Sequence, residues 1–187
     1  MLCASGPENQ KLLPSAVVRG RKNPLYFGFA LRLARTRIAA DMAGPALSLA
    51  VDMHRGAASE LEAGDRIPRL DTVEKLAKVL NVSPCFLAYG IDQPCDAGDG
   101  SLSAGLPARL AELRQDRGLS RRALGRLSET SDNFVQKTES RATVPTIAKV
   151  EALAKALNVS PCWLAYGVGD RDLPAGRRPA AQSPDPA

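Results

Sequence analysis

The stretch that decides the fold is VEKLAKVLNVSPCFLAYGI at residues 73–91, because it returns as VEALAKALNVSPCWLAYGV at residues 150–168. The two stretches are identical at 15 of 19 positions, with a constant offset of 77 residues. Extending this offset backwards without a gap pairs Leu33 with Leu110. The chain therefore contains two copies of one unit of about 65 residues.

Apolar residues follow a helical spacing within each copy. Val150, Leu153, Ala154 and Leu157 stand at positions i, i+3, i+4 and i+7, as do their counterparts in the first copy. The string Asn-Val-Ser-Pro that follows in both copies can end this helix at the asparagine. It can also start a short final helix, with serine as the N-cap and proline at the first helical position. Both copies are thus predicted to end as helix, tight turn, helix.

The front half of the second copy predicts three more helices. They span residues 109–117, 120–127 and 132–139, with a break at Gly118, a turn at 128–131 and Ser131 as the N-cap of the third. Two short helices joined by a short turn, the second presenting polar side chains, are typical of a helix-turn-helix.

Composition supports an all-α fold and a division into domains. The 187 residues include 44% hydrophobic but only 4% aromatic residues, which favours two small helical cores over one large core. The predicted organisation has five segments: an N-terminal basic arm at 1–27, a first domain at 28–91, a linker at 92–104, a second domain at 105–169 and a disordered proline-rich tail at 170–187.

The net charge of +5 is unevenly distributed between the copies. Residues 28–92 hold eight basic and eight acidic side chains, whereas residues 105–169 hold ten basic and six acidic ones, a net charge of +4. A positive domain favours binding to phosphate groups. The second copy is therefore the better candidate for contact with DNA.

Three strings carry a resemblance to a known family: RLAELRQDRGLSRRAL at 109–124, LEAGDRIP at 61–68 and the shared VE-LAK-LNVSP tails. The chain resembles the Cro and lambda-repressor type helix-turn-helix family, also called XRE, over both copies. The resemblance implies two tandem five-helix, lambda-repressor-like domains that bind operator DNA, usually as a twofold dimer, in repressors of phages and bacteria.

On this resemblance the recognition helix of the second copy spans residues 132–139. We expect base contacts from the side chains of its exposed face, namely Asp132, Asn133, Phe134 and Gln136. We expect phosphate contacts from four basic residues around it, namely Arg121, Arg122, Lys137 and Arg141. Glu139, matched by Glu62 in the first copy, is expected to have a packing or capping role rather than to contact DNA.

The first copy departs from this pattern where DNA contact would occur. Glycine stands opposite Asn133, alanine opposite Phe134, and Gly44-Pro45 opposite Arg121-Arg122. With few groups left for phosphates, this copy is predicted to bind DNA weakly or not at all. Its remaining candidates for contact are His54, Arg55 and Ser59.

The final helix of each copy carries aromatic residues and one cysteine. Phe86, Tyr89, Trp163 and Tyr166 either pack on their own core or form an interface between the repeats or between chains. The pattern at Cys85 and Cys162 is typical of small, half-buried hydrophobic residues, and a redox role is the alternative. With no signal-peptide pattern and no membrane-length apolar run, we expect a reduced, cytoplasmic protein.

The sequence contains no catalytic arrangement of residues and no metal-ligand spacing, so we expect neither an enzyme nor a cofactor. The expected partner is double-stranded DNA, bound by a homodimer or by an intramolecular pseudo-dimer of the two repeats. The predicted function is a sequence-specific regulator, a repressor of phage or mobile-element type. The alternative is a protein-interaction module, an anti-regulator or antitoxin-like partner built on the same scaffold.

Overall fold

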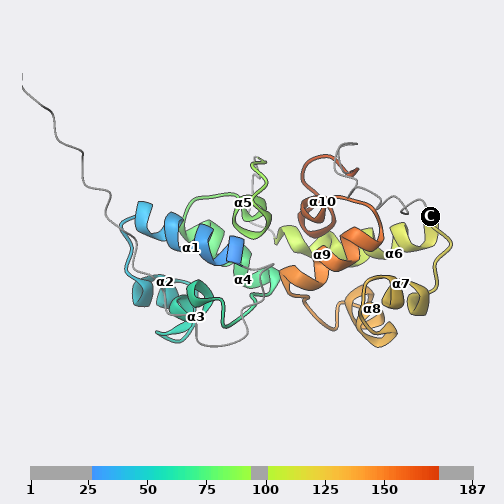
Figure 1. Cartoon of the computed structure of the whole chain (residues 1–187), viewed down its shortest axis with the longest axis horizontal. Helices are drawn as coiled ribbons and strands as arrows, with labels where there is room; N and C mark the ends of the chain where they lie inside the picture. The colour runs from blue at the N-terminus through green and yellow to red at the C-terminus, as the bar shows by residue number, and fades with distance from the viewer. Residues whose placement is uncertain (1–26, 94–100, 173–187) are drawn as a thin grey trace, which may run out of the picture.

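The computed structural model describes residues 27–93 and 101–172. Each repeat consists of five α-helices (Figure 1). The first repeat contains α1 (Phe27–Ala39), α2 (Gly44–Ala50), α3 (Ala57–Ala63), α4 (Leu70–Val79) and α5 (Pro84–Tyr89). The second contains α6 (Leu106–Asp116), α7 (Arg121–Leu127), α8 (Asp132–Glu139), α9 (Ile147–Ala156) and α10 (Pro161–Tyr166), preceded by a short 3-10 helix, η2 (Leu102–Gly105). The predicted all-α fold with two tandem five-helix domains is confirmed.

The helix ends follow the capping residues that the sequence predicted. The backbone of Asn81 and Asn158 is left-handed, with φ of 52° and 48°, two residues after the last residue of α4 and of α9. Ser160 is the N-cap of α10, and its hydroxyl accepts a hydrogen bond from the N–H of Trp163. The helix predicted at 109–117 begins three residues earlier, at Leu106, because Pro107 is compatible with the first turn of a helix.

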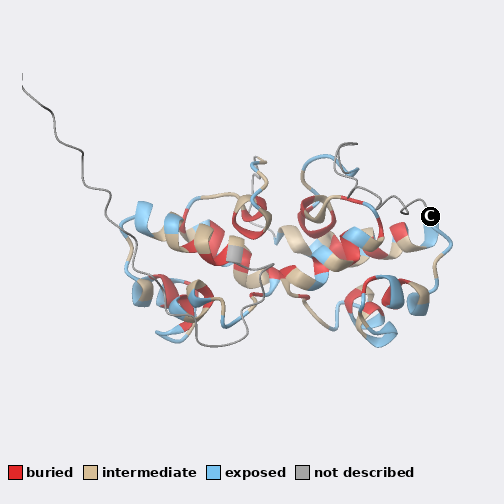
Figure 2. Ribbon diagram, viewed as in Figure 1, coloured by how far each residue is buried: buried red, intermediate tan, exposed pale blue. Residues whose placement is uncertain are grey.

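Leucine and valine residues at equivalent positions form the core of both repeats. Leu47 and Leu124 are fully buried, as are Val73 and Val150. Burying one such side chain stabilises the fold by roughly 1.5–3 kcal/mol. Figure 2 shows the buried residues on the inner faces of the helices in both repeats, and they form one continuous hydrophobic cluster.

An arginine ties the first helix of each repeat to the last helix of that repeat. In the second repeat, Arg109 donates hydrogen bonds to the carbonyl oxygens of Leu164 and Ala165, at 3.0 and 2.7 Å. In the first repeat, Arg32 makes the same two bonds to the carbonyl oxygens at the end of α5, at the same distances. These oxygens have no partner within their own helix, so the arginines satisfy helix ends that would otherwise be unpaired.

The two repeats meet across an approximate twofold axis. The N–H of Leu70 donates to the carbonyl oxygen of Pro145 at 3.0 Å, and the N–H of Ile147 donates to that of Pro68 at 3.1 Å. Leu70 and Ile147 are equivalent residues, as are Pro68 and Pro145, so each repeat gives and receives the same bond. Such a reciprocal contact is the pattern of a symmetric dimer interface, here within one chain. The predicted intramolecular pseudo-dimer has this arrangement.

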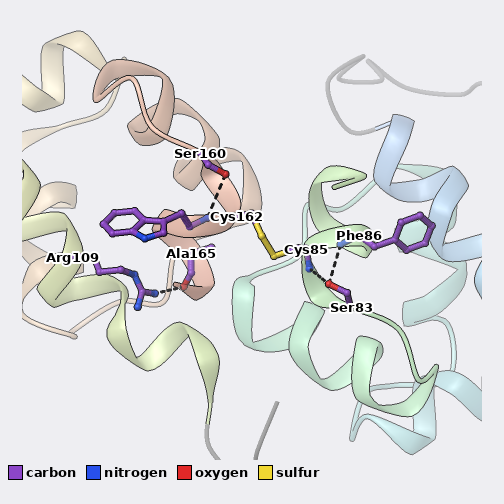
Figure 3. The surroundings of a disulfide bond; sticks show 8 residues. Ser83, Cys85, Phe86, Arg109, Ser160, Cys162 and Ala165 are labelled. Atoms are coloured by element: carbon purple, nitrogen blue, oxygen red, sulfur yellow. Dashed lines mark hydrogen bonds between the residues drawn. A yellow bond between two sulfur atoms is a disulfide. The ribbon is translucent and has the colours of Figure 1, made fainter. Parts of the chain in front are cut away.

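A disulfide links the repeats at Cys85 and Cys162, with 5.4 Å between the two Cα atoms. The interpretation of these cysteines as separate, half-buried hydrophobic residues is therefore wrong, and the pairing agrees with the redox alternative. Both residues are completely buried, at 0% and 1% exposure. They meet because α5 and α10 lie side by side at the twofold axis, which brings equivalent residues of the two repeats together (Figure 3).

The predicted linker and tail are partly structured. In the linker, Glu74 of α4 accepts hydrogen bonds from the Ser101 hydroxyl and the Ser103 N–H, at 2.7 and 2.6 Å. At the start of the tail, the carbonyl oxygen of Arg171 accepts a hydrogen bond from the N–H of Ser160 at 2.8 Å. The prediction of disorder from residue 170 is therefore wrong for residues 170–172. The basic arm at 1–26 and the rest of the tail lie outside the described residues.

Within the two described ranges, no helix is long and apolar enough to cross a lipid bilayer.

Candidate DNA-binding interface

Helices α7 and α8 form the helix-turn-helix of the second repeat, and Gly125 of α7 lies against the turn that joins them. A Cβ atom added to Gly125 would lie 3.0 Å from the backbone nitrogen of Asp132 and 3.2 Å from the carbonyl oxygen of Thr130. A larger side chain would have to push the two helices apart, which is why glycine suits this position. This close contact holds the start of α8 against α7.

Helix α8 buries one face and exposes the other. Ser131 caps its start, with its hydroxyl accepting a hydrogen bond from the N–H of Phe134 at 3.0 Å. Val135 is fully buried, whereas Asn133 and Gln136 are exposed on the solvent face. Both amide side chains are therefore placed where a bidentate contact with adenine is possible.

The other two predicted base-contacting residues are more constrained. Asp132 is exposed, but its carboxylate accepts a hydrogen bond from the neighbouring N–H of Asn133 at 2.9 Å. Phe134 is half-buried at the edge of the core, and the ammonium group of Lys149 lies 5.7 Å from the centre of its ring. The structure thus leaves Asn133 and Gln136, among the four predicted for base contact, as the exposed side chains without a described hydrogen bond.

Glu139 connects the end of α8 to two arginines. Its carboxylate accepts hydrogen bonds from the side chain of Arg114 at 2.6 Å and from that of Arg121 at 2.7 Å. The Glu139 and Arg114 side chains are only 5% and 11% exposed, whereas that of Arg121 is 50% exposed. Glu139 therefore has the structural role that the sequence predicted, and it fixes the orientation of α8 against α6 and α7.

The ion pairs of Glu139 alter its titration. Burial raises the pKa of this carboxyl group, but the hydrogen bonds and positive charges of Arg114 and Arg121 outweigh burial and lower the pKa below its ordinary value. Glu139 is therefore ionised at neutral pH. Its charge offsets part of the positive charge of Arg121, which weakens the phosphate contact predicted for that arginine.

The other predicted phosphate-contacting residues remain open to solvent. Arg122, Lys137 and Arg141 are exposed, and within the described part of the chain none of them forms an ion pair. Arg126 is equally exposed, although sequence analysis did not predict it as a site residue. It follows Arg122 by four residues on α7, a spacing that places both on one face of a helix and could have revealed it.

The corresponding helix of the first repeat, α3, is shorter at its N-terminus. It begins at Ala57, and no side chain caps its start, because His54 stands where the second repeat has Ser131. Ser48 replaces Gly125, and its hydroxyl accepts a hydrogen bond from the N–H of Ala58 at 3.0 Å. In the first repeat, a side chain of α2 therefore stabilises the start of α3 in place of an N-cap residue.

The predicted contact residues of the first repeat differ in accessibility. His54 lies 2.9 Å from the carboxylate of Glu60, which also forms a 3.8 Å ion pair with Arg66. Arg55 and Ser59 are exposed. An acidic side chain in this cluster opposes the approach of a phosphate group.

The outer face of α2 is apolar where α7 is basic. Leu49, which stands opposite Arg126, is 55% exposed, and Pro45, opposite Arg122, is exposed as well. Ile38, at the end of α1, is 60% exposed and stands opposite Gln115. The surface that carries positive charge in the second repeat therefore carries aliphatic side chains in the first.

The aromatic residues predicted at an interface divide into two groups. Tyr89 contacts the other repeat, its hydroxyl donating to the carbonyl oxygen of Ile147 at 3.5 Å, and Tyr166 is buried. The ring of Phe86 points away from the disulfide (Figure 3). Trp163 packs against its own repeat, where the Arg171 guanidinium lies 5.6 Å from its ring.

Comparison with known families identifies both repeats. Residues 106–166 match a family described as helix-turn-helix domain, and residues 34–87 match a second family described as helix-turn-helix. No curated protein and no solved structure matches the chain. The chain belongs to the helix-turn-helix class and carries two such domains in tandem. Domains of this class occur in DNA-binding regulators, so DNA binding and transcriptional regulation are the general function of the chain.

Proposed function

We propose that the chain is a repressor of phage or mobile-element type that recognises an asymmetric operator, with residues 105–169 making most of the base contacts. The observation that carries this proposal is the contrast between α7 and α2. Exposed Arg122 and Arg126 on α7 are matched by Pro45 and Leu49 on α2. Only the second repeat combines basic side chains for phosphates with exposed amides for bases.

The arrangement of the repeats supports contact of both with one duplex. Helices α3 and α8 lie on the same side of the molecule, opposite α5 and α10 (Figure 1). A twofold arrangement of helix-turn-helix units matches the local twofold symmetry of duplex DNA. The chain would therefore act as a single-chain pseudo-dimer, with domain 28–91 adding weak backbone contacts beside the main site.

A binding titration tests the base contacts. The full chain is titrated against labelled duplexes, both random and selected from a library, at several salt concentrations. Asn133→Ala with Gln136→Ala should weaken binding to the selected duplex by roughly 1–3 kcal/mol per lost contact. Ser59→Ala is the matched control, because Ser59 stands opposite Gln136 in the first repeat, and its effect should be small. Equal losses in the two variants would contradict the proposal.

The phosphate contacts are tested in the same titration. Arg122→Ala should weaken random and selected duplexes alike and reduce the salt dependence by about one unit. A loss confined to the selected duplex would show that Arg122 contacts bases instead.

A second function is favoured by the exposed Leu49 and Ile38 of the first repeat. Aliphatic side chains at these positions suit a protein partner better than a phosphate backbone. On this alternative the duplicated scaffold binds another regulator. The absence of binding to any duplex at low salt, together with loss of a protein complex in Leu49→Glu, would support it over the DNA-binding proposal.

A further inference from the structure

The contact between the repeats contains a disulfide whose chemistry the proposed function does not use. Cys85 and Cys162 occupy the same position in α5 and α10, and their Cα atoms lie 5.4 Å apart, within the usual range for a disulfide. No local turn or shared helix brings them together, since 77 residues separate them in sequence. The bond can therefore form only when the two repeats are docked.

Polar contacts besides the disulfide also join the repeats. They include the reciprocal backbone bonds at Leu70 and Ile147, the 3.5 Å bond from the Tyr89 hydroxyl and an electrostatic attraction between Arg32 and Glu151. Each backbone bond contributes only about 1 kcal/mol. A covalent link between the repeats restricts the undocked arrangements and so stabilises the docked one further. The oxidation state of the cysteines therefore affects how tightly the repeats are held.

We propose that Cys85 and Cys162 are a thiol–disulfide exchange site whose oxidation state determines how tightly the two repeats are held together. The co-reactant is a low-molecular-weight disulfide such as glutathione disulfide. The thiolate of one cysteine attacks it, releasing one glutathione thiolate and forming a mixed disulfide. The second cysteine thiolate attacks the protein sulfur of that mixed disulfide and releases the second glutathione. In total, two protein thiols and one glutathione disulfide give the protein disulfide and two glutathione thiols.

Burial of the cysteines couples this exchange to movement of the repeats. Cys85 and Cys162 are 0% and 1% exposed, so a mixed disulfide cannot form while α5 and α10 are packed together. Exchange in either direction therefore proceeds through an opened contact between the repeats. Anything that keeps the repeats docked slows exchange and favours the oxidised form.

This inference rests on the proposed function for its link to DNA. A duplex that contacts both α3 and α8 requires the docked arrangement, which the disulfide also stabilises. By thermodynamic linkage, oxidation then strengthens binding to such a duplex, and the duplex favours oxidation by the same factor. The site would make DNA affinity depend on the thiol–disulfide balance around the protein.

The test uses the full chain with Cys3→Ser and Cys95→Ser, so that only Cys85 and Cys162 can pair. Amide hydrogen exchange is followed by NMR at Leu70 and Ile147, whose N–H groups cross between the repeats, in oxidised and in fully reduced protein. Reduction should accelerate exchange at both amides by at least about tenfold, while the buried amide of Val150 serves as a control for global unfolding. Unchanged exchange at both amides after reduction would overturn the proposal.

A DNA titration of the same samples separates this inference from the proposed function. Reduced protein, and the variant Cys162→Ala, should bind a duplex carrying both half-sites at least about tenfold more weakly than oxidised protein. Oxidised protein, reduced protein and Cys162→Ala should all bind a duplex that carries only the second-repeat half-site with the same affinity. If the two amides respond to reduction but no duplex binds either form, the exchange site stands and the proposed function fails. Equal affinities for the two-site duplex would refute the link to DNA.

Discussion

Substituting Glu139 with glutamine tests the ion pairs that hold α8 in place. Glutamine keeps the shape of the side chain but removes the negative charge that pairs with Arg114 and Arg121. Arg114 is only 11% exposed, so its guanidinium would be left buried without a countercharge, with the carbonyl oxygen of Leu119 at 2.8 Å and at most one amide oxygen as acceptors. Removing one member of a buried ion pair costs about 3 kcal/mol.

The equivalent substitution in the first repeat provides the matched control. Glu62 pairs with Arg37 alone, and both side chains are 18% exposed, so solvent replaces part of the lost interaction. Glu62→Gln should therefore reduce the free energy of unfolding by about 1.5 kcal/mol, half the effect of Glu139→Gln.

Urea denaturation followed by the circular dichroism of the helices measures this difference. Both repeats are helical, so this signal reports on the domain that contains Glu62 as well as on the one that contains Glu139. Glu139→Gln should lower the midpoint without changing the slope of the transition. Equal destabilisation by the two substitutions, or less than about 1 kcal/mol for Glu139→Gln, would refute the assigned role of this carboxylate.

Two further predictions concern pH and the start of α8. Because the folded-state pKa of Glu139 is lowered, its stabilising effect should be complete above the ordinary glutamate pKa of about 4.3 and disappear as the pH falls through the lowered pKa. Acid unfolding curves of the wild type and Glu139→Gln should accordingly converge at low pH, and a constant difference would contradict this origin. Ser131→Ala should destabilise the protein by about 1 kcal/mol through loss of the N-cap, whereas His54→Ala at the equivalent position caps nothing and should have little effect in the same urea assay.

Local features of each repeat were largely predictable from the sequence. The cap at Ser131, the left-handed Asn158 and the helix at 132–139 follow from residue types and short spacings, because they depend on interactions within one turn of chain. The structural role of Glu139 was also predicted, although its partners were not. Arg114 precedes Glu139 by 25 residues, and only the packing of α6 against α8 brings the two together.

The residues that pair across the contact between the repeats were the main feature that sequence analysis missed, although it left the final helices open as an interface between the repeats. Equivalent positions can be aligned from an internal repeat, but the alignment does not show which surface of one copy faces the other. The disulfide between Cys85 and Cys162 and the reciprocal bonds at Leu70 and Ile147 depend on that choice. The informative signal was that a lone cysteine stands at the same position in both copies. Residues on a twofold axis meet their own equivalents, so two such cysteines can pair.

The central claim is that two copies of one scaffold form a pseudo-dimer in which α8 supplies most of the base contacts. Selection of bound sequences from a random duplex library, with the wild type and with Asn133→Ala plus Gln136→Ala, tests it most directly. The wild type should select an asymmetric site with one strongly specified half, and the double variant should lose the specificity of that half alone. A palindromic site with two equally specified halves, or a site unchanged in the double variant, would contradict the claim.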